Sequence, residues 1–85
     1  MLIKLARSIT FGETNYGGVF LDQKKGTYWE VNESGAEIVQ LSLQSSTVED
    51  VARTMSTSHG LDFGEAVSDV AELLDSLIEA GLVIK

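Results

Sequence analysis

Residues 26–41 read GTYWEVNESGAEIVQL, and the spacing of the apolar residues changes within this stretch. The part up to Val31 is rich in aromatic and β-branched residues, which is typical of a strand. From Ala36 onward the apolar residues recur at helical spacing, which indicates a helix. The stretch therefore predicts a strand that leads directly into a helix, and we expect that helix to run to about Gln44.

The residues before this stretch predict two further strands. Two runs with strand composition flank the segment DQKKG at residues 22–26. Gly26 stands where a type I turn followed by a bulge requires a positive φ, so residues 18–31 predict a β-hairpin. An earlier strand is expected within Lys4–Phe11, and it should end at the glycine-rich loop Gly12–Gly18.

Three capping signals divide the rest of the chain into three helices. The signals are Ser34 with Glu37 (or Asn32 as an alternative cap), Thr47 with Asp50, and Asp62 with Glu65. Gly60 and Gly81 are placed to end the second and third helices, and residues 82–84 form an apolar tail. The order predicts one α+β domain over residues 1–85, in which a three-stranded antiparallel sheet precedes three helices in a winged helix-turn-helix-like arrangement.

The composition of the chain excludes several classes of protein. Without cysteine there is neither a disulfide framework nor a thiolate metal site, and the sequence fits a reducing compartment such as the cytoplasm. The apolar N-terminus is interrupted by Lys4 and Arg7, so it lacks the continuous apolar region of a signal peptide, and no segment is long enough to span a membrane. Thirteen acids against six bases give a net charge of −7, which repels nucleic acids and anionic lipids. Neutral or basic partners are therefore expected.

No combination of residues points to catalysis, metal binding or a phosphate-bearing cofactor. His59 is the only histidine and lies at a predicted helix end, where the backbone dipole favours it, so we do not expect a nucleophile–His–acid site. The carboxylates show neither an EF-hand spacing nor an HExxH pair. The segment GETNYGG at residues 12–18 lacks the Lys-Ser/Thr of a phosphate-binding loop. The chain is therefore predicted to be neither an enzyme nor a cofactor-binding protein.

The third predicted helix carries acids and no base. Its acids are Glu65, Asp69, Glu72, Asp75 and Glu79. Evenly spread carboxylates usually form a solvated face, although a basic partner would also suit them. A DNA-binding helix gains affinity from Lys and Arg beside phosphates, and there are none between Arg53 and Lys85. A winged-helix DNA-binding regulator is therefore the disfavoured alternative.

Tyr28 and Trp29 are adjacent on the predicted strand and therefore point to opposite faces of the sheet. Trp29 shares its face with Val31, and Tyr28 shares the other with Glu30. We expect Trp29 to pack against the helices in the core and Tyr28 to cover the outer side of the sheet. A free edge of this strand would accept a partner strand by β-augmentation, and the third helix would form the second wall of such a site.

The run from Gly18 to Leu82 resembles the PqqD family of small chaperones in cofactor and peptide natural-product maturation. The shared residues, in order, are Leu21-Asp22, Gly26 before the aromatic pair, Asn32, Ser34-Gly35-Ala36, and a closing LxxLxxxGL formed by Leu74, Leu77, Gly81 and Leu82. They span about three quarters of the chain. The resemblance implies recognition of ribosomally made, modified peptides, whose leader binds as an added strand beside the third strand and against the third helix.

The aromatic pair and the chain length further resemble the stand-alone recognition protein of split lasso peptide systems. Such a protein hands the leader, which carries a Tyr-X-X-Pro motif, to a cysteine-type leader peptidase before a cyclase closes the ring. The resemblance thus implies a precursor leader and a leader peptidase as partners, with the cyclase as a further one. The pyrroloquinoline quinone chaperone, which binds its precursor and a radical enzyme, is the alternative within the family.

Carried over to this sequence, the resemblance implies a peptide-binding site on two elements. Its residues are Thr27, Tyr28, Trp29, Glu30 and Val31 on the strand, Val67, Val70, Leu74 and Leu77 lining a pocket on the third helix, and Asp69, with Glu30, at the rim. The sequence departs from the family pattern in Val31 and Ser34, where leucine and threonine are frequent, and in its lack of proline. Since free edges also pair with each other, a dimer through residues 27–31 is a further expectation.

Overall fold

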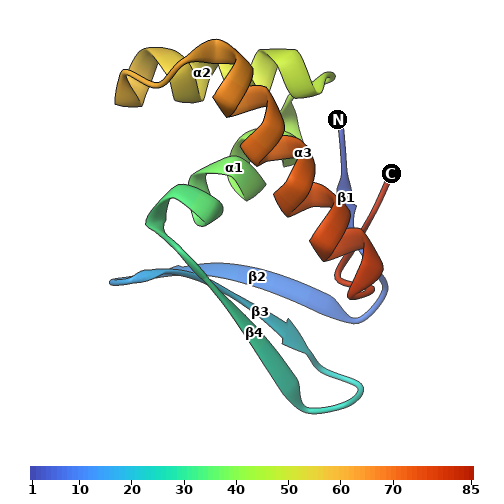
Figure 1. The fold of residues 1–85 in the computed structure, drawn as a ribbon. Helices are drawn as coiled ribbons and strands as arrows, with labels where there is room; N and C mark the ends of the chain where they lie inside the picture. Colours follow the sequence, from blue (N-terminus) through green and yellow to red (C-terminus); the bar gives the residue numbers. More distant parts are fainter.

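A three-stranded antiparallel sheet is followed by three helices, so the predicted α+β fold is confirmed (Figure 1). The computed structural model describes residues 1–85. Its elements are β1 (Lys4–Leu5), β2 (Ile9–Thr14), β3 (Gly17–Asp22), β4 (Thr27–Asn32), α1 (Glu33–Gln44), α2 (Val48–His59), α3 (Phe63–Glu79) and β5 (Val83–Ile84). The helices lie on one side of the sheet, with α1 next to it. None of them is long and apolar enough to cross a membrane.

The hairpin of β3 and β4 forms as predicted, within a sheet of order β2-β3-β4. Gly26 has a φ of 71°, and its N–H donates to the carbonyl oxygen of Asp22 at 2.8 Å. The Asp22 carboxylate accepts hydrogen bonds from the N–H groups of Lys24 and Lys25, each at 3.0 Å. An aspartate at the start of a tight turn closes it by bonding to the backbone that follows. These bonds hold the register of the two strands.

The boundaries of the first predicted strand and of the loop after it are wrong. β2 continues to Thr14, because the glycine-rich segment 12–18 pairs with β3 instead of forming a loop. Only residues 15–16 make the turn. Glycine at position 18 reflects packing, since a Cβ there would lie 2.4 Å from the end of the Phe11 ring. The glycines that suggested a loop therefore include one that makes room for an aromatic side chain inside the sheet.

β1 and β5 form a second, two-stranded antiparallel sheet, which the sequence did not predict. The two ends of the chain therefore lie side by side (Figure 1). The N–H groups of Leu2 and Ile3 donate to the carbonyl oxygen of Ser42 at 3.1 and 3.2 Å, and Ile3 is buried. The expected apolar tail after α3 is thus partly a strand that, with β1, closes one end of the core.

Asn32, and not Ser34, caps α1. The Oδ1 atom of Asn32 accepts a hydrogen bond from the N–H of Gly35 at 2.8 Å. The hydroxyl of Ser34 donates to the same Oδ1 atom at 3.2 Å. Asn32 keeps an extended backbone at the end of β4, whereas Ser34 is already inside the helix and is not placed to cap it. The predicted Ser34 capping box is therefore wrong, and the alternative cap is confirmed.

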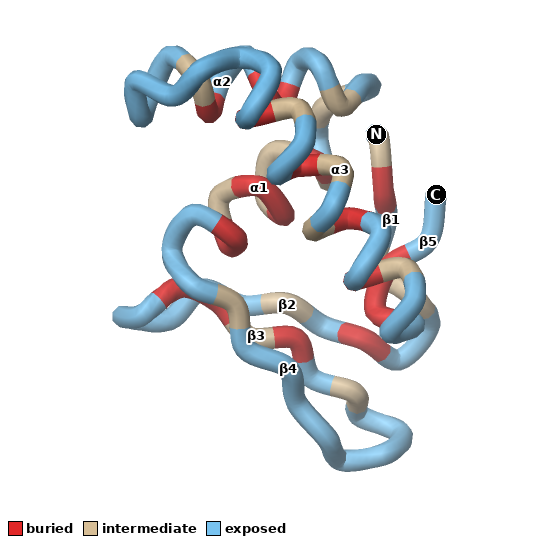
Figure 2. Tube along the Cα trace, in the orientation of Figure 1, coloured by how far each residue is buried: buried red, intermediate tan, exposed pale blue.

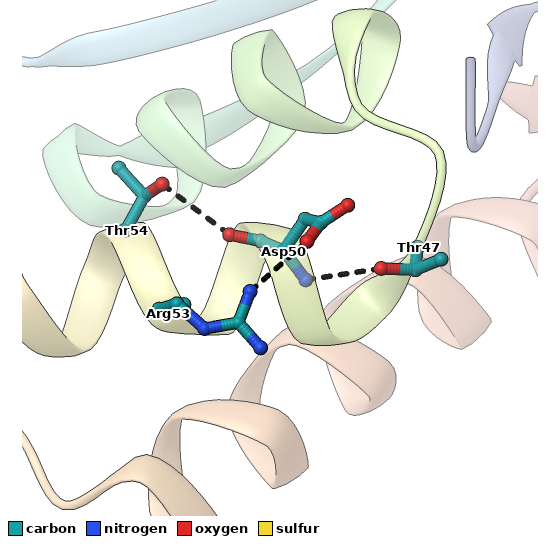
Figure 3. Close-up of polar contacts among 4 residues, drawn as sticks. All are labelled: Thr47, Asp50, Arg53 and Thr54. Atoms are coloured by element: carbon teal, nitrogen blue, oxygen red, sulfur yellow. Dashed lines mark hydrogen bonds and ion pairs between the residues drawn. The ribbon is translucent and has the colours of Figure 1, made fainter.

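The predicted cap of α2 is confirmed, as is its end. The Oγ1 atom of Thr47 accepts from the N–H of Asp50 at 3.1 Å, and the Asp50 carboxylate pairs with Arg53 at 3.0 Å (Figure 3). The hydroxyl of Thr54 donates to the carbonyl oxygen of Asp50 at 3.3 Å. Gly60 ends the helix with a φ of 65°. The first turn of α2 is thus held by its own side chains, all of which are exposed to solvent.

The predicted cap and end of α3 are also confirmed. Asp62 accepts a hydrogen bond from the N–H of Glu65 at 3.1 Å. At the other end, the N–H of Leu82 donates to the carbonyl oxygen of Leu77 at 3.0 Å, and Gly81 has a φ of 78°. This is the Schellman arrangement, in which a glycine in the left-handed region closes the last turn. Leu77 and Leu82 are both buried, so the helix end is fixed to the core.

The core lies between the inner face of the sheet and the three helices (Figure 2). The largest of its fully buried side chains are Phe20, Ile3, Leu77, Val39, Val51, Val70 and Val83. The outer face of the sheet is uncovered, and Leu21 and Tyr28 are exposed there as neighbours on adjacent strands. Only one face of the sheet is therefore used for the fold.

Candidate functional site

β4 lies at an edge of the three-stranded sheet, where only β3 pairs with it. Five of its six residues are exposed. An edge strand presents unpaired backbone N–H and C=O groups that a second chain can use. β4 therefore provides a free edge with room beside it.

An apolar groove of about 410 Å³ lies between β4 and α3. Seven of its twelve lining residues are hydrophobic. The lining residues are Trp29, Glu30, Val31, Asn32, Ser34, Gly35, Ile38, Met55, Leu61, Ala66, Asp69 and Leu73. Because the strand and all three helices contribute to it, the groove is a product of the complete fold.

Trp29 is on the inner face of the sheet but does not belong to the core. Its neighbour on β3, Phe20, is fully buried, whereas Trp29 is 45% exposed. The difference arises because Trp29 is on the edge strand, so its ring lies in the groove. The prediction that Trp29 packs in the core is therefore wrong. Tyr28 is 68% exposed on the outer side of the sheet, where it was predicted.

Most residues of α3 that were expected to line a pocket point elsewhere. Val70, Leu74 and Leu77 are buried in the core, and Val67 is half-buried against it. These four residues do not line the groove, because the same side of α3 packs against the rest of the fold. Asp69 is the one predicted helix residue that does line it. On the strand, the predicted residues Trp29, Glu30 and Val31 line the groove, and Thr27 and Tyr28 do not.

The groove contains residues that the sequence did not predict. On α3 these are Ala66 and Leu73, which lie on the same helix face as Asp69 because they are three and four positions from it. The others are Asn32, Ser34, Gly35, Ile38, Met55 and Leu61. One signal for Leu73 was present in the sequence. Adjacent helical residues point about 100° apart, so Leu73 and Leu74 cannot both face the core directly.

Gly35 allows the start of α1 to lie close to β4. A Cβ atom at this position would lie 3.1 Å from Oδ1 of Asn32, 3.2 Å from Cβ of Val31 and 3.7 Å from Cδ2 of Leu73. Two of these contacts are closer than ordinary van der Waals separation. The missing side chain therefore keeps the end of the groove open, beside the polar side chains of Asn32 and Ser34.

Acidic residues lie along the groove, although alternation on β4 puts the Glu30 side chain on the outer face of the sheet with Tyr28. Glu30 and Asp69 line the groove, and a neighbouring hollow on α3 is lined by Asp69, Glu72, Leu73, Asp75 and Ser76. Nowhere in the structure are three or more His, Asp or Glu side chains arranged to hold a metal ion. Apolar walls with an acidic border suit a neutral or basic ligand that is held by backbone and apolar contacts.

His59 lies at the C-terminal end of α2, as predicted, and connects it to α1. Its Nε2 atom is 2.9 Å from Oε1 of Glu37. Both side chains are partly exposed to solvent, and neither lines the groove. The geometry is that of a surface contact between two helices.

The profile of the family described as "Coenzyme PQQ synthesis protein D (PqqD)" matches residues 17–83. No curated protein matches the chain. A solved structure described as "Lasso peptide synthetase B1 complexed with the leader peptide" is similar over 100% of both chains, with 33% identity and a TM-score of 0.90.

A second solved structure, "TbiB1 in Complex with the TbiA(beta) Leader Peptide", is similar over 94% of this chain and 93% of its own. Its TM-score is 0.82 and its identity to this chain is 19%, so this likeness concerns the fold alone.

Proposed function

The chain belongs to the PqqD family, and we propose that it binds the leader peptide of a ribosomally made precursor of the lasso peptide class. The observation that carries this proposal is that the free edge of β4 and the apolar groove lie along the same strand. The full-length structural match at 33% identity supports it, because that protein is described in complex with a leader peptide.

In the proposed complex the leader adds to β4 as a further strand. Main-chain hydrogen bonds along the edge supply affinity, and side chains that enter the groove supply specificity. About six main-chain bonds and two side-chain anchors are consistent with micromolar or tighter binding, about −8 kcal/mol or better.

The groove has the properties that a tyrosine side chain requires. A buried tyrosine needs apolar contacts for its ring and a hydrogen-bond partner for its hydroxyl group. Val31, Leu73 and the other hydrophobic residues of the groove supply the apolar contacts. Asn32 and Ser34, which also line the groove, supply polar groups for the hydroxyl group. The Tyr-X-X-Pro motif implied by the family resemblance fits this arrangement.

The role of the protein is then positioning. It holds the leader and presents the cleavage site, beyond the bound segment, to a separate cysteine-type leader peptidase, before a cyclase acts on the core peptide. The second candidate is a chaperone for the pyrroloquinoline quinone precursor, which the description of the family favours. Titration with a lasso precursor and with a pyrroloquinoline quinone precursor separates the two candidate functions. A protein that is specific for one precursor should bind the other precursor weakly.

The test is a titration with a fluorescein-labelled leader peptide, encoded beside the gene, and with its tyrosine-to-alanine version. We expect saturable binding that weakens at least about tenfold without the tyrosine, since a buried aromatic contact is worth about 1.4 kcal/mol or more. Trp29→Ala should weaken binding similarly, while Tyr28→Ala, on the opposite face of the same strand, is the matched control and should bind normally. No binding of either peptide by the folded protein would refute the proposal.

A further inference from the structure

A second hollow shares the residue Trp29 with the apolar groove. It is lined by Trp29, Ser76, Glu79 and Ala80, and we call it the terminal hollow. Its volume is about 410 Å³. Only Trp29 belongs to both cavities, so the two sections of the site meet at this residue.

Three features of the terminal hollow attract a positive charge. The face of an indole ring attracts cations through its quadrupole. Glu79 contributes a carboxylate that forms no ion pair within the molecule. The hollow also lies at the C-terminal end of α3, where the helix dipole is negative and where the last turn carries no basic residue. None of the residues that line the hollow is basic.

We propose that the terminal hollow binds a lysine or arginine side chain of the peptide that occupies β4. This inference rests on the proposed function and adds to it the chemical class of a second anchor. The net charge of −7 and the absence of bases from α3 favour a cationic ligand over an anionic one. A long basic side chain would lay its methylene groups on the indole ring and place its charge beside Glu79.

The geometry of α3 gives the spacing between the two anchors. Asp69 and Leu73 border the groove, and Ser76 and Ala80, each seven residues further along, border the terminal hollow. Seven helical residues span about 10 Å. An extended peptide covers this distance in about three residues, and only residues an even number apart point to the same side. The basic residue should therefore lie two or four positions from the residue that fills the groove.

The experiment uses four labelled leader peptides, each with a single lysine placed two or four positions before or after the tyrosine. Four matching peptides carry norleucine in place of that lysine. Norleucine keeps the apolar stem and lacks the charge. We expect at least one lysine peptide to bind about three- to tenfold more tightly than its match at low ionic strength. Glu79→Gln should remove this difference. Glu65→Gln, at an exposed position of the same helix that lines neither cavity, should retain it.

The outcomes distinguish this inference from the function on which it rests. If the peptides bind but lysine and norleucine versions are equal at all four positions, or if Glu79→Gln leaves the difference intact, the cation site is refuted and leader binding stands. If no peptide binds to the folded protein, both proposals fail. Since Trp29 is the only tryptophan, its fluorescence gives an independent signal for a charge placed against the ring.

Discussion

The core face and the groove face of α3 differ in what covers them. On the core face, Val70, Leu74 and Leu77 are buried against the rest of the fold. Leu73, on the groove face, is only half-buried, because β4 approaches this side of the helix from the sheet edge alone. Apolar residues on one helix can thus serve either stability or recognition. The comparison implies that substitutions on the two faces should separate these properties.

The largest effect is expected on the core face. Leu77→Ala should lower the free energy of unfolding by about 2–5 kcal/mol, because it leaves a cavity at a side chain with 0% exposure. Urea denaturation measures this change. Molecules that remain folded should bind the leader with nearly unchanged affinity, since Leu77 does not line the groove. A large loss of affinity in the folded fraction would show that the two faces are not independent.

The next effect concerns the groove face. Leu73→Ala should weaken leader binding about tenfold, as expected for the loss of about 1.4 kcal/mol of apolar contact, and cost about 1 kcal/mol of stability. Fluorescence titration and urea denaturation measure the two quantities. Ser68→Ala is the control, because Ser68 is an exposed residue of α3 that lines neither cavity. Equal affinities for Leu73→Ala and the wild type would remove the groove from the proposed site.

The two faces of α3 also show which features of the site could be predicted from the sequence. The helical spacing and the Asp62 cap predicted the bounds of α3 almost to the residue. Local capping and periodicity determine where a helix begins and ends, and both can be read from the sequence. The rotation of the helix about its axis was not predictable in the same way. α3 has apolar residues at 73 and 74, and packing against other elements decides which of them faces the core.

The exposure of Trp29 was mispredicted, and the strand β5 was not predicted, for a related reason. Alternation correctly gave the face of the sheet on which Trp29 lies, but its exposure depends on how far the helices extend over the edge strand. The pairing of β1 with β5 joins two-residue strands from opposite ends of the chain. Such short segments carry no periodic signal of their own, so the sequence could identify the tail as apolar but not its partner.

A smaller effect tests the core face of another helix. Ser42 of α1 is fully buried, and its Oγ atom has no hydrogen-bond partner. Ser42→Ala should raise the free energy of unfolding by about 1 kcal/mol, because a buried unsatisfied hydroxyl is costly and alanine favours the helix. Ser68→Ala, at an exposed helix position, should gain only about 0.5 kcal/mol. A loss of stability on Ser42→Ala, in thermal or urea unfolding, would show that the hydroxyl group makes a favourable interaction.

The smallest effect is expected from duplex DNA, for which α3 is unsuited. Its acids at positions 65, 69, 72, 75 and 79 are all exposed, and the helix carries no base. Binding to a polyanion is driven by the release of counterions when Lys and Arg neutralise phosphates. Because α3 carries neither Lys nor Arg, it cannot release counterions in this way. We expect no retarded band with a labelled duplex at low ionic strength, at protein concentrations that saturate the leader. A band that disappears with added salt would instead assign the helix-turn-helix arrangement to nucleic acid, and the acidic border of the groove would then need another explanation.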